Sequence, residues 1–150
     1  RSSDLIPTDW ELYGDPFYWT QILFNLVENA LKQNTEPGLS ITVAAAKTQD
    51  ACVITVTDTG VGIPAESIPF LFNRFYRVET HHSSEIRGTG LGLSIVKRAV
   101  EAHDGAITVS SIPHRETVFT ITIPLKRFRE EKRIRQLSQV SIETSANKST

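Results

Sequence analysis

The sequence predicts an α/β fold with two layers, in which a mixed, mostly antiparallel sheet is covered on one face by helices. Two long segments, at about residues 16–33 and 92–103, have helix start and stop signals and apolar residues at helical spacing. Four shorter segments, at 40–46, 51–57, 106–110 and 117–123, are rich in β-branched residues. Strands that are mostly linked as hairpins are expected to form one sheet, and the helices are expected to cover one face of it and share its core.

The first predicted helix has clear signals at both ends. Asp15 supplies a cap acceptor, Pro16 suits the first helical position, and residues 36–38 (Glu-Pro-Gly) stop the helix. We expect its core-facing side chains to be Leu23, Leu26, Val27, Ala30 and Leu31.

The remaining elements follow in order. A polar turn at 47–50 joins the first two strands, and a short helix is expected at about 65–72, after the glycines and proline of 60–64. Residues 77–88 are polar and aperiodic, which predicts a mobile loop. The second long helix should stop at Gly105, before the last two strands.

The composition is that of an ordinary globular domain. The 150 residues are 39% hydrophobic and 22% charged with a formal net charge of −1, so nucleic acid is not an expected partner. The single cysteine, Cys52, lies in an apolar run and favours a reducing compartment, here the cytoplasm. No segment approaches the ~20 apolar residues of a membrane span and no signal peptide opens the chain, so any membrane anchor is expected outside it.

The chain is expected to divide at about residue 125. Residues 1–125 form the predicted domain, whereas residues 126–150 carry seven Lys or Arg against three Glu and end in a stretch rich in Ser, Thr and Asn. This composition predicts a disordered tail, and a surface for a partner or a membrane is the alternative.

Three polar residues share one face of the first helix. Asn25, Asn29 and Lys32 fall within roughly 60° of one another at about 100° per residue. A merely solvated face would carry Lys, Glu and Arg, because asparagine is a poor helix former. Amide oxygens suit Mg²⁺, and Lys32 can reach a phosphate. By itself, this face supports a functional and a structural interpretation equally.

Two glycine-rich turns complete the set of candidate segments. Asp58 ends a strand, where its carboxylate can accept a hydrogen bond from the exocyclic amine of adenine. Gly60 and Gly62 after it permit close approach of a ligand, although an ordinary turn explains them equally well. The second turn, residues 88–93, opens directly into a helix, where free amides form an anion site. It has no P-loop pattern.

In order and spacing, four segments resemble those of the ATP-binding catalytic domain of bacterial sensor histidine kinases. That domain belongs to a superfamily with gyrase, mismatch-repair and chaperone ATPases. The segments are the N box at 25–34, the glycine boxes at 58–64 and 88–93, and the F box at 72–77. The match covers about residues 11–124 and implies a Bergerat-type α/β sandwich.

The resemblance implies ATP and Mg²⁺ as ligands. Asn29, helped by Asn25, would hold the metal, Lys32 would lie near the phosphates, and Asp58 would bind the adenine amine. The loop between Arg77 and Gly88 would close over the triphosphate. The catalytic set implied is Asn25, Lys32, Arg74 and Arg77. The nucleotide-binding set adds Gly60, Gly62, Ile63, Gly88, Thr89, Gly90, Leu91, Gly92, Leu93 and Thr117.

The residue at position 25 distinguishes two chemistries. Hydrolases of this superfamily carry a glutamate there as general base for water, and an amide cannot take that proton. The resemblance therefore implies transfer of the γ-phosphoryl group to a histidine, although Glu28 is a nearby carboxylate. An ATPase and a nucleotide-binding module without kinase activity are the alternatives.

The implied partners lie outside the chain. His81, His82, His103 and His114 are expected to be loop or surface residues, so the acceptor histidine belongs to a dimerisation domain of the same parent protein. Without that domain the chain is expected to be inactive. A response regulator would act downstream, and the parent protein could be anchored in the bacterial inner membrane. The chain departs from the family pattern at Gln33, where an aromatic residue is usual, at Arg87, and at Glu116, where glycine is expected.

Overall fold

The computed structural model describes residues 14–34, 37–78 and 92–124. Along the chain these form α1 (Pro16–Gln33), β1 (Ile41–Lys47), β2 (Ala51–Asp58), the 3₁₀ helix η2 (Ile68–Phe70), α2 (Gly92–Ala102), β3 (Ala106–Ile112) and β4 (Glu116–Pro124). The two long helices and four strands expected from the sequence are therefore confirmed, with strand ends that differ by one or two residues.

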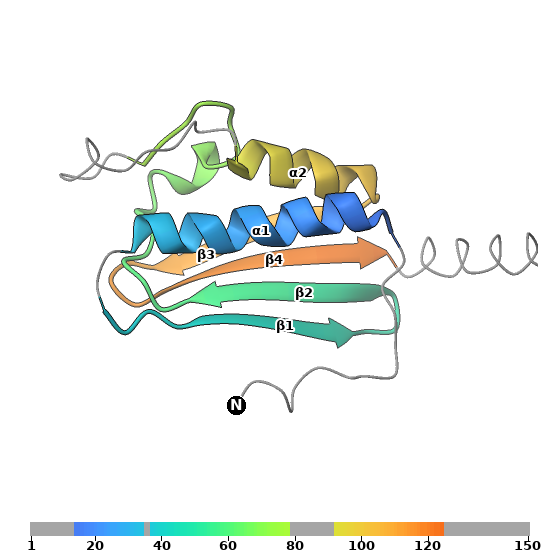
Figure 1. Cartoon of the computed structure of the whole chain (residues 1–150), viewed down its shortest axis with the longest axis horizontal. Coiled ribbons are helices and arrows are strands. Elements are labelled where there is room, and N and C mark those ends of the chain that lie inside the picture. The colour runs from blue at the N-terminus through green and yellow to red at the C-terminus, as the bar shows by residue number, and fades with distance from the viewer. Residues whose placement is uncertain (1–13, 35–36, 79–91, 125–150) are drawn as a thin grey trace, which may run out of the picture.

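The four described strands form one sheet in the order β1-β2-β4-β3, and every pairing is antiparallel. Both long helices lie on the same face of this sheet (Figure 1). The predicted two-layer α/β architecture is confirmed. Its consequence for the site is that the end of β2, the start of β4 and the β3–β4 turn meet at one end of the sheet.

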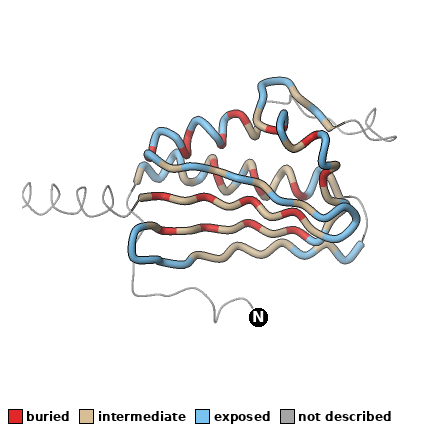
Figure 2. Tube along the Cα trace, turned by 180° about the vertical axis from the view of Figure 1, so that it is seen from behind, coloured by how far each residue is buried: buried red, intermediate tan, exposed pale blue. Residues whose placement is uncertain are grey.

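The core lies between the sheet and the helices. Buried residues alternate along the two central strands, because successive strand side chains point to opposite faces (Figure 2). Phe119 and Ile121 from β4 meet Ile22 and Leu26 from α1, and all four are almost fully buried. Cys52 is buried in the same core, and burial raises the pKa of its thiol.

The apolar side of α1 differs from the expectation. Leu26 and Ala30 are buried and Leu23 packs against the core, but Leu31 is 57% exposed and Val27 only partly covered. With Phe17 and Phe24, Leu31 forms a stripe spaced seven residues apart, within roughly 40° on the helix side that faces away from the sheet. The prediction that Leu31 faces the core was wrong because the sheet contacts a narrower arc of the helix.

The prediction of a short helix at 65–72 was also wrong about the kind of helix. The segment is a 3₁₀ turn at Ile68–Phe70 with turns on both sides. Its backbone hydrogen bonds join residues three apart, as from Leu71 N to Ile68 O. Pro69 supplies no N–H, and Pro64 lies just before the segment, so a regular α-helical ladder cannot form.

His103 is a buried residue, which corrects the expectation of a loop or surface position. Its Nδ1 lies 2.8 Å from the carbonyl oxygen of Ala99, and its ring lies 5.4 Å from the ring of Trp19. The other ring nitrogen, Nε2, accepts a hydrogen bond of 3.4 Å from the amide of Asp15. His103 therefore joins the end of α2 to the start of α1.

The end of α2 is set by two neighbouring residues. Asp104, not Gly105, has the left-handed backbone with φ of 56°. Gly105 is needed for a different reason: a Cβ there would lie 2.5 Å from Cδ1 of Ile123 and 2.8 Å from the carbonyl oxygen of Thr122. The sequence signal was correct, but the glycine serves close packing against β4.

We predict that Gly105→Ala destabilises the domain by about 1–3 kcal/mol, the usual cost of forcing a methyl group into a packed interior. Urea unfolding at neutral pH measures this. Ser110→Ala, on an exposed position of β3, is the control and should change the free energy of unfolding by less than about 0.5 kcal/mol. A loss as small for Gly105→Ala would contradict the packing assignment.

Candidate functional site

The candidate site begins at the polar face of α1, between its core side and its exposed stripe. Nδ2 of Asn25 donates to the carbonyl oxygen of Gln21 at 2.8 Å, which fixes the orientation of the amide. Its Oδ1 is directed toward the first residue of α2, because a Cβ on Gly92 would lie 3.3 Å from this oxygen. The structure thus brings Asn25 and Gly92, 67 positions apart in the sequence, into contact range.

Asn29 and Lys32 lie further along the same face. Lys32 Nζ forms an ion pair with Glu28 Oε1, and both side chains are partly exposed, so the pair adds little stability. Asn29 is partly buried and makes no hydrogen bond to any other described residue. The Asn29 amide can therefore accept a new partner without breaking a bond within the described chain.

Asp58 is a buried carboxylate at the end of β2, with 5% of its surface exposed. It is the register partner of Thr117 on β4, which is also buried. Burial raises the pKa of Asp58 above its ordinary value of 3.8, while hydrogen bonds from the Gly60 amide (3.0 Å) and the Asn34 side chain lower it in part. The carboxyl group is thus tied to the glycine loop and has little contact with solvent.

The glycine loop at 60–63 is held by the β3–β4 turn. The amide of Ile63 donates to Ser111 Oγ at 2.8 Å, and the amide of His114 donates to the carbonyl of Val61 at 2.7 Å. Gly62 has φ of 75°, and a Cβ there would lie 2.7 Å from the carbonyl oxygen of Ile112. The loop can approach this turn so closely only because position 62 is glycine.

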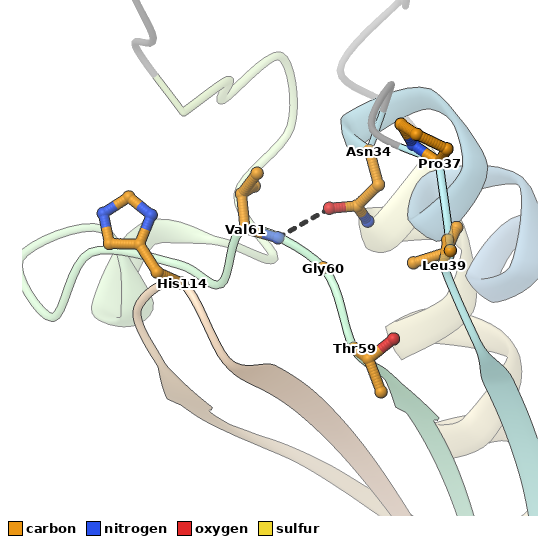
Figure 3. Close-up of a pocket in the computed structure, with 8 residues that line it drawn as sticks. Asn34, Pro37, Leu39, Thr59, Gly60, Val61 and His114 are labelled. Atoms are coloured by element: carbon orange, nitrogen blue, oxygen red, sulfur yellow. Dashed lines mark hydrogen bonds between the residues drawn. The ribbon is translucent and has the colours of Figure 1, made fainter.

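On its other side the glycine loop contacts the end of α1. Asn34 is the C-cap residue of α1, and its Oδ1 accepts a hydrogen bond of 2.7 Å from the amide of Val61 (Figure 3). A cavity of about 250 Å³ adjoins this bond. Its lining residues are Asn34, Pro37, Gly38, Leu39, Thr59, Gly60, Val61 and His114.

The F box lies after η2. Phe72 packs against Phe119 with ring centroids 6.2 Å apart, so this residue anchors the segment to the core. Phe75 is 67% exposed with φ of 65°, and Cζ of Arg74 lies 5.6 Å from its ring centroid. Arg77 is exposed near the end of the described segment. The roles expected for Arg74 and Arg77 remain predictions.

The structure brings together two groups of the residues that the sequence indicated. Asn25, Asn29, Lys32, Gly92 and Leu93 lie along α1 and at the start of α2, and Asp58, Gly60, Gly62, Ile63 and Thr117 gather at the end of β2. Gly88, Thr89, Gly90 and Leu91 lie outside the described residues.

The sequence placed Asn34 at the end of the N box without a role and did not single out Ser111, yet these two residues hold the glycine loop from two sides. The position of Asn34 at the helix end was a usable signal, since asparagine commonly caps helices. Nothing in the sequence alone pointed to Ser111.

A divalent metal would find neutral oxygen ligands here rather than a carboxylate cage. Among the residues that the structure describes, no three His, Cys, Asp or Glu side chains are grouped to hold a metal ion. Asn25 and Asn29 offer one amide oxygen each. Mg²⁺ commonly takes one or two protein oxygens and completes its shell with phosphates and water, so this donor set fits a metal that arrives with a phosphate ligand.

Solved structures define the class of this domain. The fold matches a mycobacterial sensor histidine kinase, MprB, with a TM-score of 0.66 and 29% identity over 77% of each chain. It also matches the catalytic domain of histidine kinase ThkA, with a TM-score of 0.61 and 28% identity over 74% of this chain and 69% of that one. The fold is that of histidine kinase catalytic domains.

Sequence comparison supports the same assignment. The model of the histidine kinase-, DNA gyrase B- and HSP90-like ATPases matches residues 14–127. The chain is 39% identical to the sensor histidine kinase WalK of Bacillus subtilis over 113 residues, and 40% identical to the adaptive-response sensory kinase SasA of Synechococcus elongatus over 118 residues. These matches cover 75% and 78% of the chain, but only 18% and 30% of the relatives.

The chain belongs to this ATPase family, and within it to the ATP-binding domains of sensor histidine kinases. Among the described residues, no helix has the length and apolar character needed to cross a membrane.

The buried carboxylate predicts a pH-dependent effect of Asp58→Asn. Because the native pKa is raised above 3.8, the folded domain binds more protons than the unfolded chain between 3.8 and the native pKa, so this group lowers stability as pH rises through that window. The stability of Asp58→Asn relative to wild type should therefore increase as the pH rises from about 3.5 to about 7. Urea midpoints at both pH values measure the change.

Asp50→Asn, in the exposed β1–β2 turn, is the matched control and should shift the urea midpoint little at either pH. A stability difference between wild type and Asp58→Asn that stays constant with pH would contradict the proposed cost of burying this charge.

Proposed function

We propose that this domain binds Mg-ATP between α1, the glycine loop and the start of α2, and that it transfers the γ-phosphoryl group to a histidine of another domain. The observation that carries the proposal is the approach of the Asn25 oxygen to Gly92. One amide of the polar face of α1 thus lies near the end of α2 at which backbone amides have no partner within the helix, and Asn29 and Lys32 follow on the same face of α1.

The phosphates would be held by groups of several kinds. Asn29 and Asn25 would supply oxygen ligands to Mg²⁺, which neutralises phosphate charge when bound. Lys32 would exchange its weak ion pair with Glu28 for a phosphate oxygen. Arg74 and Arg77 would add charge from the F box, and Gly88 to Leu93 would present backbone amides.

The base would be read at the other end of the site. The Asp58 carboxylate would accept a hydrogen bond from the 6-amino group of adenine, with Thr117 beside it in the ladder. Gly60, Gly62 and Ile63 would line this end. Their fixed position on the β3–β4 turn supports this role, because recognition of a single amine requires a rigid acceptor.

Phosphoryl transfer is favoured over hydrolysis by the groups on α1. The side chain at position 25 is an amide, which cannot take a proton from water at neutral pH. In the transfer, a lone pair of the acceptor imidazole forms the P–N bond while the bond from phosphorus to the β–γ bridging oxygen breaks, and ADP leaves with that electron pair. The domain contributes positioning and charge neutralisation.

The proposed partners are those that the similarity to sensor histidine kinases suggests. The acceptor histidine would lie on a dimerisation domain of the same parent protein, and a response regulator would receive the phosphoryl group next. The domain would work in the cytoplasm, with a parent protein in the bacterial inner membrane. The small share of the curated relatives that the chain spans supports a parent with further domains.

Incubation with γ-labelled ATP and Mg²⁺ tests the proposed chemistry. We expect acid-labile, alkali-stable label to appear on a supplied dimerisation domain, which is the behaviour of a phosphorus–nitrogen bond. The chain alone should release almost no phosphate. Rapid phosphate release by the chain alone would identify an ATPase, and ATP binding without labelling of a competent acceptor would identify a binding module.

We predict that Asn29→Ala lowers affinity for Mg-ATP at least about tenfold, because a metal ligand is lost, while the fold is retained. Calorimetric titration with and without Mg²⁺ measures the effect, and circular dichroism checks the fold. Gln49→Ala, an amide in the exposed turn at the far end of the sheet, is the control. Equal loss of affinity with and without Mg²⁺ would argue against a role of Asn29 at the metal.

A further inference from the structure

We propose that Asn34 is a positioning residue that fixes the distance between the phosphate end and the base end of the nucleotide site and thereby sets selectivity for adenine. The role depends on the proposed nucleotide function. It is carried by the contacts of one side chain at the junction of α1 and the glycine loop (Figure 3).

The two ends of the site belong to different elements. Asn25, Asn29 and Lys32 lie on α1, whereas Asp58 and the glycine loop follow β2. The helix rests on the sheet through apolar side chains of the shared core. Apolar packing sets the rotation of the helix, but a directional contact is needed to hold the end of α1 and the loop after β2 at one fixed distance.

Asn34 supplies a directional connection. Its Nδ2 donates to the carbonyl oxygen of Ala30 at 2.6 Å, inside the last turn of α1. Its Oδ1 accepts from the amide of Val61 at 2.7 Å, inside the glycine loop. One planar amide thus joins a carbonyl of the helix to an amide of the loop and fixes both partners at once.

Two further observations show that the loop is fitted to this side chain. A Cβ on Gly60 would overlap the amide of Asn34, so the loop approaches at this distance only with glycine at position 60. The Asn34 side chain also lies near enough to the Asp58 carboxyl to lower its pKa, as the hydrogen bond from the Gly60 amide does. The same amide therefore contacts the loop and acts on the carboxylate proposed to read the base.

Asn34 lies at the base end of the proposed site, beside the glycine loop and the Asp58 carboxyl. We expect Asn34 to contribute to selectivity among bases rather than to overall affinity for phosphates.

Asn34→Ala and Thr20→Ala form a matched pair. Thr20 Oγ1 also donates to a carbonyl four residues earlier in α1, that of Pro16, but it lies at the other end of the helix. Both substitutions remove one side-chain hydrogen bond to the helix backbone, and only Asn34→Ala removes the bond to the glycine loop. Asp58→Asn serves as the reference for lost base recognition.

Binding of three ligands distinguishes a positioning role of Asn34 from a general effect on stability. ATP and inosine triphosphate differ at the base, where a carbonyl replaces the 6-amino group, and tripolyphosphate has no base. For Asn34→Ala, calorimetry should show about a tenfold loss of affinity for ATP, less than about a threefold loss for inosine triphosphate, and unchanged tripolyphosphate binding. Thr20→Ala should match wild type for all three ligands.

A second measurement needs no nucleotide. Amide hydrogen exchange at Val61 should be about fivefold faster in Asn34→Ala, since a hydrogen bond of about 1 kcal/mol is lost. Thr20→Ala leaves this bond in place, so its Val61 exchange should stay within about twofold of wild type. Equally fast exchange in both variants would overturn the assignment of the Asn34 oxygen as the acceptor.

The outcomes distinguish the two levels of the proposal. If the wild-type chain bound no ATP, the nucleotide function and the role of Asn34 would both be overturned. If the wild type bound ATP and Asn34→Ala kept the same preference for ATP over inosine triphosphate, only the positioning role would be overturned. A uniform loss of affinity for all three ligands would likewise reject it in favour of a purely structural role.

Discussion

The apolar contact between one face of the sheet and a narrow arc of α1 determines the rest of this structure. Ile22, Leu26 and Ala30 are buried against the sheet and α2, and this fixes the rotation of the helix about its own axis. Asn25 and Asn29 then fall at the border of the buried arc, where they are partly covered but still accessible. Had the helix turned by one position, these amides would point into the core or into solvent.

The glycine loop, in contrast, is held in position by hydrogen bonds from polar groups. Its residues follow a central strand, but the loop itself rests between the β3–β4 turn and the end of α1. Ser111 and the amide of His114 hold it from the turn, and Asn34 holds it from the helix. The geometry of the base end therefore depends on hydrogen bonds, which are directional, whereas the layers depend on burial, which is not.

The site combines a stability cost with a functional use. Burial of the Asp58 carboxyl raises its pKa and weakens the folded state when the group is ionised. The same burial removes competing water from an acceptor that would bind one amine. The pairing of Lys32 with Glu28 is of the opposite kind, a partly exposed ion pair that is weak enough to be exchanged for a ligand.

The fold was largely predictable because its signals are local. The cap at Asp15 with Pro16, the periods of α1 and α2, and the alternation in β2 and β4 act within a few residues, and the structure confirms them. The prediction failed where tertiary packing, rather than the local pattern, decided which residues are buried. Leu31 has the right spacing for an apolar face, but the sheet contacts a narrower arc of α1, and His103 is buried because the start of α1 packs over it.

The sequence by itself determined which groups this protein offers to a ligand: two amides and a lysine on one helix face, a carboxylate at a strand end, and glycines where backbone must come close. Only the tertiary structure decided which of these groups meet, because their contacts join positions far apart in the chain. The approach of Asn25 to Gly92 and the bond from Val61 to Asn34 depend on how two layers rest on one core. No pattern within a short window of sequence encodes that distance.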